Sequence, residues 1–350
     1  MPKITVIGTT SWGITLGIIL GRKGLQVSLW ARTEQEATEL ANNGSNSDLS
    51  PGITFPRQLS VTSSLSEALA GAKAVVIVVP SQSVRQNVKL VAEHLKGSML
   101  IVSAAKGLEI GSGKRMSQVI ADEVQPDFWP NICVLSGPNL SQEILNELPA
   151  ATVIAAEKEA VARKARRLFA GPNLCVYTNT DVIGVELGGT LKNIIALGAG
   201  IADGLGYGDN AKAALITRGL TEMTALGVSL GANPFTFSGL AGLGDLTATC
   251  ASTLSRNHYV GVELAKGRPL KEITDSMSGV AEGVDTTFVV RNLTQQMGLE
   301  MPITETIYQV LYEGADLRQA AAELMTGGNA HELAGRKWGL FSFLRHRRRA

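Results

Sequence analysis

The segment ITVIGTTSWG, residues 4–13, decides how the first half of the chain folds. It begins as a β-branched run and continues into a turn that has Gly8 and Gly13 as its first and last glycines. An apolar helical pattern follows at once. A strand, a glycine turn and a helix in this order are typical of a dinucleotide site, because the helix N-terminus presents free N–H groups to the pyrophosphate. Thr10 replaces the second glycine of the usual G-x-G-x-x-G pattern, so a simple tight turn in an α/β fold is the alternative.

Further β-branched runs alternate with helical patterns up to about residue 180. Val75–Val79 is apolar throughout, as a strand covered on both faces must be. This alternation predicts a Rossmann-type α/β domain with a doubly wound parallel sheet. The expected strands are Ile4–Ile7, Gln26–Trp30, Val75–Val79, Leu100–Ser103, Ile132–Leu135, Thr152–Ala155 and Leu174–Tyr177. The expected helices are Trp12–Arg22, Thr33–Ala41, Val84–Leu95, Ser117–Val124 and Glu159–Phe169.

The second half has a different texture, with Ala/Leu/Gly-rich segments and no strand-like runs, which predicts an all-α domain. Glycine clusters, including Gly239–Asp245, are expected to be loops between helices. We expect a dinucleotide-binding domain in residues 1–180, a helical substrate and catalytic domain in residues 181–335, and a basic tail in residues 336–350. The expected helices are Val185–Ala202, Asn210–Leu226, Arg256–Ala265, Asp285–Met297, Glu305–Leu311 and Leu317–Met325.

Composition excludes several classes of protein. The 350 residues are 45% hydrophobic and 18% charged, which excludes a disordered chain. With 32 basic and 31 acidic residues, the net charge of +1 gives no reason to expect a nucleic-acid partner. The three cysteines lie far apart, which favours a reducing cytosol over a disulfide framework or a zinc site. We expect a soluble, cytoplasmic protein, since no stretch approaches the roughly 20 apolar residues of a membrane span and no secretory cleavage site follows the N-terminus.

Two basic residues follow predicted strands, where ligands bind in such sheets. Arg32 comes where an NAD-preferring site usually carries an acid, and a guanidinium there suits the 2′-phosphate of NADP. Lys106 is surrounded by small residues that leave its approach open. A solvated surface side chain is the alternative for both residues.

Polar residues interrupt the apolar helical half. Lys192 must either extend to solvent or lie buried with a partner, in which case its pKa falls toward a range useful for proton transfer. Asp245, after a glycine cluster, could be that partner. Ser255–His258 offers a guanidinium and an amide at an expected helix start, which suits a phosphate. His331–Gly335 resembles the zinc motif H-E-x-x-H but lacks the second histidine, so we expect no metal.

Together these segments resemble the bacterial-type NAD(P)-dependent glycerol-3-phosphate dehydrogenases. The resemblance covers roughly residues 3–335. It rests on Gly8–Gly13, Trp30–Arg32, Ala105–Glu109, Ser136–Pro138, Leu191–Asn193, Gly239–Asp245, Ser255–Asn257 and Ala281–Thr286, in that order.

The resemblance implies an oxidoreductase that interconverts dihydroxyacetone phosphate and sn-glycerol 3-phosphate with NADPH or NADH, supplying phospholipid synthesis. It implies that Lys192 is the general acid/base and Asp245 its partner, both near the substrate, and that the protein is a homodimer. The implied substrate ligands are Lys106, Gly137, Asn139, Lys192, Asp245, Ser255, Arg256 and Asn257. The implied cofactor ligands are Gly8, Ser11, Trp12, Gly13, Arg32, Lys106, Ser141, Arg256, Val280 and Glu282.

The chain departs from the family pattern at Thr10, and at residues 137–141, which read Gly-Pro-Asn-Leu-Ser instead of the more usual Gly-Pro-Ser-Phe-Ala. Two other functions stay open: a 2-hydroxy-acid or sugar-acid dehydrogenase on the same architecture, and a dinucleotide sensor without activity. Arg32 predicts that NADPH is used at least as well as NADH. Apolar and basic residues in the tail also allow a weak contact with an anionic membrane.

Overall fold

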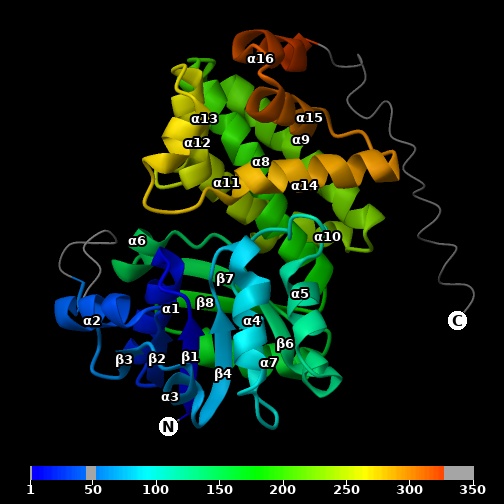
Figure 1. Ribbon diagram of the computed structural model, residues 1–350. Helices are drawn as coiled ribbons and strands as arrows, with labels where there is room; N and C mark the ends of the chain where they lie inside the picture. The colour runs from blue at the N-terminus through cyan, green and yellow to red at the C-terminus, as the bar shows by residue number, and fades with distance from the viewer. Residues whose placement is uncertain (1, 45–52, 327–350) are drawn as a thin grey trace, which may run out of the picture.

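The computed structural model describes residues 2–44 and 53–326 (Figure 1). The expected basic tail, residues 336–350, and the rejected zinc motif His331–Gly335 lie outside the described residues. All strands of the described chain precede Thr180, and the regular elements between residues 182 and 326 are helices joined by short connections. In Figure 1 the sheet and its helices occupy the lower half of the molecule and the helical domain the upper half.

One eight-stranded sheet organises the lower half, in the order β3-β2-β1-β4-β5-β6-β7-β8. Neighbouring strands are parallel except β6 and β7, which are antiparallel. The doubly wound α/β fold is therefore confirmed, but the expectation of a wholly parallel sheet is wrong at this pair. The strands are β1 (Lys3–Ile7), β2 (Gln26–Trp30), β3 (Leu59–Thr62), β4 (Ala72–Ile77), β5 (Leu100–Ser103), β6 (Ile132–Ser136), β7 (Ala150–Ala155) and β8 (Leu174–Asn179).

Alternate side chains of the central strands enter two separate hydrophobic cores. Val76 of β4 packs in the core that contains α1, α6 and α7, whereas Val75 and Ile77 pack in the core that contains α3, α4 and α5. Burial on both faces explains the unbroken apolar run Ala74–Val79, which includes the last four residues of β4. These helices are α1 (Ser11–Arg22), α2 (Glu34–Asn43), α3 (Leu65–Leu69), α4 (Val84–Ala92), α5 (Met116–Glu123), α6 (Ser141–Leu145) and α7 (Glu159–Phe169).

The helical domain is built around α8 (Val182–Gly204), whose residues Gly184–Ala202 are all buried. By length and composition α8 could cross a membrane, which corrects the expectation that no stretch is apolar enough. However, 89% of its apolar window is buried inside the protein, as in a core helix. The surrounding helices are α9 (Gly208–Ser229), α10 (Pro234–Phe237), α11 (Asp245–Ala251), α12 (Arg256–Ala265), α13 (Leu270–Asp275), α14 (Glu282–Met297), α15 (Pro302–Tyr308) and α16 (Leu317–Thr326).

Some elements differ from the sequence expectation. The glycine cluster Gly239–Asp245 is not a loop, because Leu240–Gly244 forms a π-helical turn, η3, that runs directly into α11. Strand β3 and the short helices α3 and α6 were not expected, since brief elements carry little periodicity.

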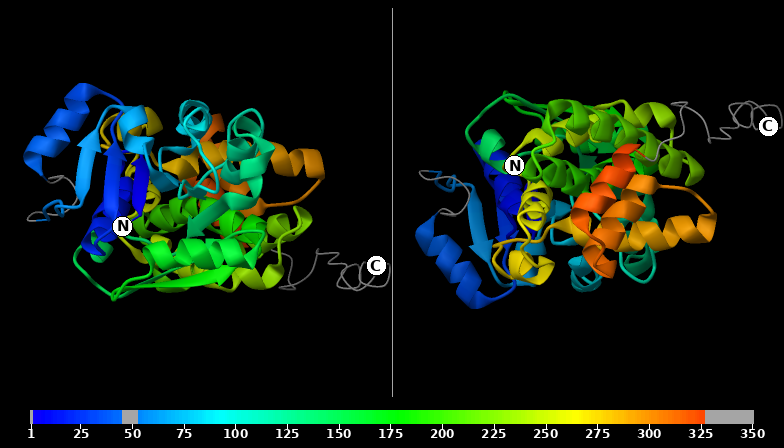
Figure 2. Two further views of the ribbon diagram at one scale, coloured as in Figure 1. Left: turned by 90° about the horizontal axis from the view of Figure 1, so that it is seen from below. Right: turned by 90° about the horizontal axis from the view of Figure 1, so that it is seen from above.

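Seen from below and from above, α2 and α14 lie at opposite sides of the molecule (Figure 2).

Candidate active site

A buried carboxylate between two lysines lies where the two halves meet. The Lys192 Nζ of α8 donates to Oδ1 of Asp245, and also to the Thr249 hydroxyl at 2.5 Å. The Lys106 Nζ, after β5, donates to Oδ2 of Asp245 at 2.6 Å and to the Gly137 carbonyl at 2.9 Å. The side chain of Asp245 is only 1% exposed. Lys106 and Gly137 from the sheet domain are thus brought to Lys192 and Asp245 of the helical domain.

Two glycines of α8 allow this approach. A Cβ on Gly188 would collide with the Ala241 carbonyl of η3, and one on Gly189 would collide with the Ser136 hydroxyl at the end of β6. The backbone of α8 therefore lies in close contact with both segments, about one helical turn before Lys192. Because η3 continues into α11, Asp245 and Thr249 lie one helical turn apart and face Lys192 together.

Burial, together with the positive charge of Lys106, lowers the pKa of Lys192 to about 8 against the opposing effect of the Asp245 carboxylate. An ammonium group with such a pKa can lose and regain a proton near neutral pH. Of the two sequence expectations for this residue, burial with a partner is the one that the structure has. The arrangement provides a proton donor next to a fixed carboxylate and a second cation.

The start of α12 provides the polar groups expected to hold a phosphate. Ser255 is the N-cap residue, and its hydroxyl accepts from the His258 N–H at 3.2 Å. The Asn257 amide donates to the Asn193 Oδ1 at 2.9 Å and accepts from the Gly283 N–H at 2.9 Å. One N–H group and one lone pair of the Asn257 amide are therefore used between α8, α12 and α14, next to Lys192. One of its N–H groups remains.

Arg256 is exposed and packs along the segment before α14. A Cβ on Gly279 would lie 2.5 Å from its Nη1, so a side chain at this position would displace the guanidinium from its present place. Val280, next along this segment, is 44% exposed. Both side chains are therefore accessible to a ligand.

Asn139 follows the end of β6. Its Nδ2 donates to the Thr152 hydroxyl at 3.1 Å, whereas its Oδ1 is buried without a partner among the described residues. An acceptor in this state suits a hydroxyl donor from a ligand. Ser141 is the first residue of α6, and its side chain is half-buried.

The glycine turn joins β1 directly to α1, with Thr10 in place of the second glycine. Gly8 has a φ of 118°, which a residue with a side chain rarely adopts. The Thr10 hydroxyl caps α1 by accepting from the Gly13 N–H at 3.1 Å, and it donates to the Val78 carbonyl at 2.9 Å. The Trp12 Nε1 is buried and has no partner among the described residues. Free amides at the start of α1 and this orphaned N–H fit a bound dinucleotide.

Other expected cofactor residues surround the turn or face it from the helical domain. Ser11 is exposed at the start of α1. The Arg32 guanidinium is exposed and donates to the Gln86 Oε1 at 3.2 Å. Glu282, at the start of α14, accepts from the backbone N–H of Ser81 at 2.9 Å and from its hydroxyl, so it links the two domains.

Sequence reasoning missed Thr249, Ser81 and Glu36. Thr249 stands four residues after Asp245, a spacing that signals a shared face only if the segment is helical, whereas a loop was expected. Ser81 lies two residues after the predicted strand Val75–Val79 but carries no charge. No acid immediately follows β2, yet Glu36 in the first turn of α2 accepts from the Arg32 backbone N–H at 3.1 Å and from the Thr9 hydroxyl.

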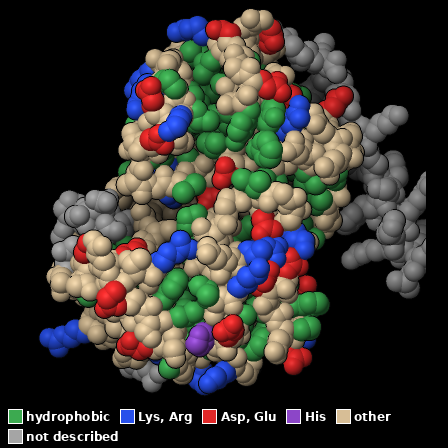
Figure 3. Space-filling model, in the orientation of Figure 1, with side chains coloured by type: hydrophobic (Ala, Val, Ile, Leu, Met, Phe, Trp, Pro, Cys, Tyr) green, Lys and Arg blue, Asp and Glu red, His purple; other side chains and the backbone are tan. Residues whose placement is uncertain are grey.

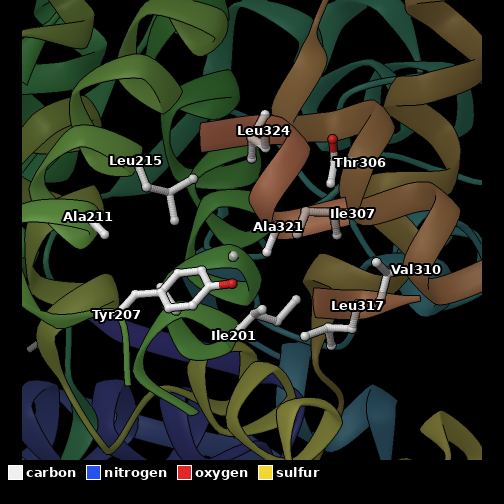
Figure 4. Close-up of a pocket in the computed structure, with 12 residues that line it drawn as sticks. Ile201, Tyr207, Ala211, Leu215, Thr306, Ile307, Val310, Leu317, Ala321 and Leu324 are labelled. Atoms are coloured by element: carbon white, nitrogen blue, oxygen red, sulfur yellow. The ribbon is translucent and has the colours of Figure 1, made fainter. Parts of the chain in front are cut away.

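Features elsewhere do not compete with this site. The apolar cavity in Figure 4, of about 50 Å³, lies among α8, α9, α15 and α16 and has Tyr207 and Thr306 as its only labelled residues with oxygen-bearing side chains. It offers no cation to a phosphate. The visible face of the sheet domain carries intermixed basic and acidic side chains near the domain junction (Figure 3). In the same domain Arg85 forms ion pairs with three acids, Glu109, Asp122 and Glu123. No cluster of three metal-ligating side chains occurs in residues 2–44 and 53–326.

Comparisons with known proteins agree with this geometry. The family model described as NAD-dependent glycerol-3-phosphate dehydrogenase N-terminus matches residues 3–162, and its C-terminus counterpart matches residues 181–322. The NAD(P)+ glycerol-3-phosphate dehydrogenase of Dehalococcoides mccartyi strain 195 is 63% identical, with 99% of this chain and 97% of that protein aligned. The enzyme of the same name from Geobacter sulfurreducens is 48% identical over 96% of this chain and 99% of its own length.

A solved structure also superposes on nearly the whole chain. The glycerol-3-phosphate dehydrogenase of Coxiella burnetii is 36% identical, with a TM-score of 0.88, and the match covers 93% of this chain and 99% of that one. Both halves of the family, in the same order, are therefore present here with the two lysines and the aspartate brought together. The chain belongs to the NAD-dependent glycerol-3-phosphate dehydrogenase family.

Proposed function

We propose that the site between the domains interconverts dihydroxyacetone phosphate and sn-glycerol 3-phosphate, with Lys192 as the group that gives and takes the proton. The observation that carries this is the buried contact of Asp245 with Lys192 and Lys106. Family membership supports the reaction, and the names of the two relatives reported above include NAD(P)+ as the cofactor. Both NADH and NADPH serve as cofactor in this proposal.

When bound, the nicotinamide supplies or accepts the hydride at C2 of the substrate. Lys192 donates a proton to the oxygen on C2 as negative charge develops on it, and removes that proton in the reverse direction. Asp245 holds the ammonium of Lys192 in place from one side and that of Lys106 from the other. Lys106 adds a second positive charge near the developing alkoxide, in a site from which water is largely excluded.

The phosphate end of the substrate would be held at the start of α12 by Ser255, Arg256 and Asn257. The helix N-terminus contributes amide N–H groups and a partial positive charge. Binding energy at this non-reacting end positions C2 for the reaction. Gly137 and Asn139 would contact the substrate from the opposite domain, with the orphaned Oδ1 of Asn139 accepting from a hydroxyl.

The cofactor would lie along the carboxyl ends of the strands, as in other doubly wound sheets. Gly8, Ser11, Trp12 and Gly13 would hold the pyrophosphate. Arg32 would bind the 2′-phosphate of NADPH, so that NADPH is used at least as well as NADH. The remaining proposed ligands, on both domains near the nicotinamide half, are Lys106, Ser141, Arg256, Val280 and Glu282.

One assay separates this reaction from its alternatives. The purified protein should oxidise NADPH with dihydroxyacetone phosphate and act poorly on unphosphorylated dihydroxyacetone or on 2-oxo acids. Equal rates with the unphosphorylated ketone would remove the proposed role of the α12 phosphate site and favour a hydroxy-acid or sugar-acid dehydrogenase. Dinucleotide binding without turnover of any of these substrates would favour a sensor.

We also propose a cytoplasmic homodimer whose product enters phospholipid synthesis, because the resemblance implies both the assembly and the use. Light scattering on the purified protein should give twice the mass of one chain. The expected domain boundaries, residues 1–180, 181–335 and 336–350, stay proposals as well. Contact of residues 336–350 with anionic membranes would be shown by liposome co-sedimentation that is lost when these residues are deleted.

A further inference from the structure

The first turn of α2 places a carboxylate beside the glycine turn. Glu36 Oε2 accepts from the backbone N–H of Arg32, at the end of β2, at 3.1 Å. Glu36 Oε1 accepts from the hydroxyl of Thr9, inside the glycine turn. The Thr33 hydroxyl caps this turn by accepting from the Glu36 N–H at 3.2 Å, which fixes the backbone of the acid. Glu36 is therefore held at the edge where β1 and β2 end.

This is the edge at which an acid in a doubly wound fold binds the ribose hydroxyls of NAD. Such an acid normally directly follows the second strand, where this chain has Arg32 instead. Each carboxylate oxygen has a second lone pair, so Glu36 can accept from a ribose hydroxyl while it keeps its two present partners. The Glu36 carboxylate, held between Thr9 and Arg32, thus presents an acceptor to a ribose 2′-hydroxyl and a repulsive charge to a 2′-phosphate.

Arg32 acts in the opposite sense in the same corner. Its guanidinium is turned toward Gln86 of α4, and no ion pair joins it to an acid in the part of the chain that the structure describes. Its positive charge is thus available to a phosphate, whereas its backbone N–H is already occupied by Glu36. A 2′-phosphate would be attracted to the Arg32 guanidinium, but it would also lie close to the Glu36 carboxylate, which already accepts from the Arg32 backbone N–H.

We infer that Glu36 is a specificity-determining residue that retains NADH as a cofactor and limits the preference for NADPH set by Arg32. The inference rests on the proposed function only in requiring that a nicotinamide dinucleotide bind at this glycine turn. In this site Arg32 favours the adenosine ribose that carries a 2′-phosphate, and Glu36 favours the ribose with a free 2′-hydroxyl.

The test compares Glu36→Gln with Glu34→Gln by titration calorimetry of NADH, NADPH, ADP-ribose and 2′-phospho-ADP-ribose. Glu34 is a matched control, because it lies in the same first turn of α2 but its carboxylate accepts from Ser63, away from the glycine turn. Both changes remove one negative charge from the same helix N-terminus. Binding of the ribose fragments reports on this corner without requiring turnover.

Glu36→Gln should shift the ratio of the two dissociation constants toward the phosphorylated ligand by about tenfold, equivalent to about 1.4 kcal/mol. Both ligands of each pair should contribute to this shift: the variant should bind NADPH and 2′-phospho-ADP-ribose more tightly, and NADH and ADP-ribose more weakly. Glu34→Gln should leave the ratio within about twofold of the wild-type value. An unchanged ratio in Glu36→Gln, or an equal shift in both variants, would overturn the inference.

The outcomes also separate this inference from the proposed function. Wild-type protein that binds neither dinucleotide would refute both, whereas binding of both with an unchanged ratio in Glu36→Gln would refute the inference alone. If Glu36→Gln unfolds, Glu36→Asp provides the same measurement, because it withdraws the carboxylate by one methylene group while keeping its charge. That variant should weaken ADP-ribose more than 2′-phospho-ADP-ribose, and an equal change in both would count against the inference.

Discussion

Replacing Lys192 with alanine should abolish most of the activity and leave cofactor binding intact. The change removes the proton donor, a role that is worth about 10²–10⁴-fold in rate. We expect kcat to fall by at least about 100-fold, equivalent to about 2.7 kcal/mol of barrier. NADPH binding should survive, because most of the proposed ligands lie in the sheet domain. Lys192→Arg should restore little, since a guanidinium holds its proton too tightly to act as an acid at neutral pH.

The same change also affects stability. Asp245 is 1% exposed and Lys192 is 8% exposed, and removing one partner of a buried pair costs about 3–5 kcal/mol. Lys106 still contacts the other oxygen of Asp245, so we expect the lower end, about 3 kcal/mol.

The assay is initial-rate NADPH oxidation with dihydroxyacetone phosphate, at a temperature where circular dichroism shows both proteins folded. NADPH binding by calorimetry is the control. A Lys192→Ala protein that is folded, binds NADPH and retains near-normal kcat would refute the proposed mechanism, because Lys192 would then be only structural.

Three further perturbations follow from the geometry. Arg32→Ala should raise the KM for NADPH about tenfold and leave that for NADH nearly unchanged, since only the 2′-phosphate gains a charge-assisted bond, and equal effects in steady-state kinetics would contradict this. Because the pKa of Lys192 is lowered to about 8 by burial, ketone reduction should fall as pH rises through about 8 while alcohol oxidation rises, and pH–rate profiles in both directions would show whether this holds. Burial raises the pKa of Glu222 to about 7, although its carboxylate accepts from the N–H groups of Ile303 and Thr304. The contribution of Glu222 to the free energy of unfolding is therefore fully present below about pH 4.5 and is lost as the pH rises through about 7. Across that interval the wild type should lose about 3 kcal/mol relative to Glu222→Ala in urea unfolding, and parallel pH dependences would exclude this role.

The sequence by itself determined the architecture, and it supplied most of the residues of the proposed site. Strands covered on both faces require continuous apolar runs, so β4 and its neighbours could be located from composition alone. The position of the glycine turn could be predicted from Gly8, because this residue adopts a φ of 118° that residues with a side chain avoid. Lys192 stood out because a charge in an apolar helix needs a partner.

Only the tertiary structure decided which groups meet. Residues 106, 192 and 245 come from three distant segments, and nothing local fixes their approach; it depends on Gly188 and Gly189 admitting the backbone of η3 and the end of β6. The antiparallel pair β6–β7 is likewise a matter of how the chain returns to the sheet, which strand periodicity does not encode.

The carboxylate of Glu36 could not be assigned from spacing, because the sequence offers several acids in residues 34–39 and only the cap of α2 selects the one that faces the glycine turn. Residue types and periodicity follow from local chemistry and can be recognised along the chain. Contacts between side chains distant in sequence depend on packing, and packing is a property of the folded whole.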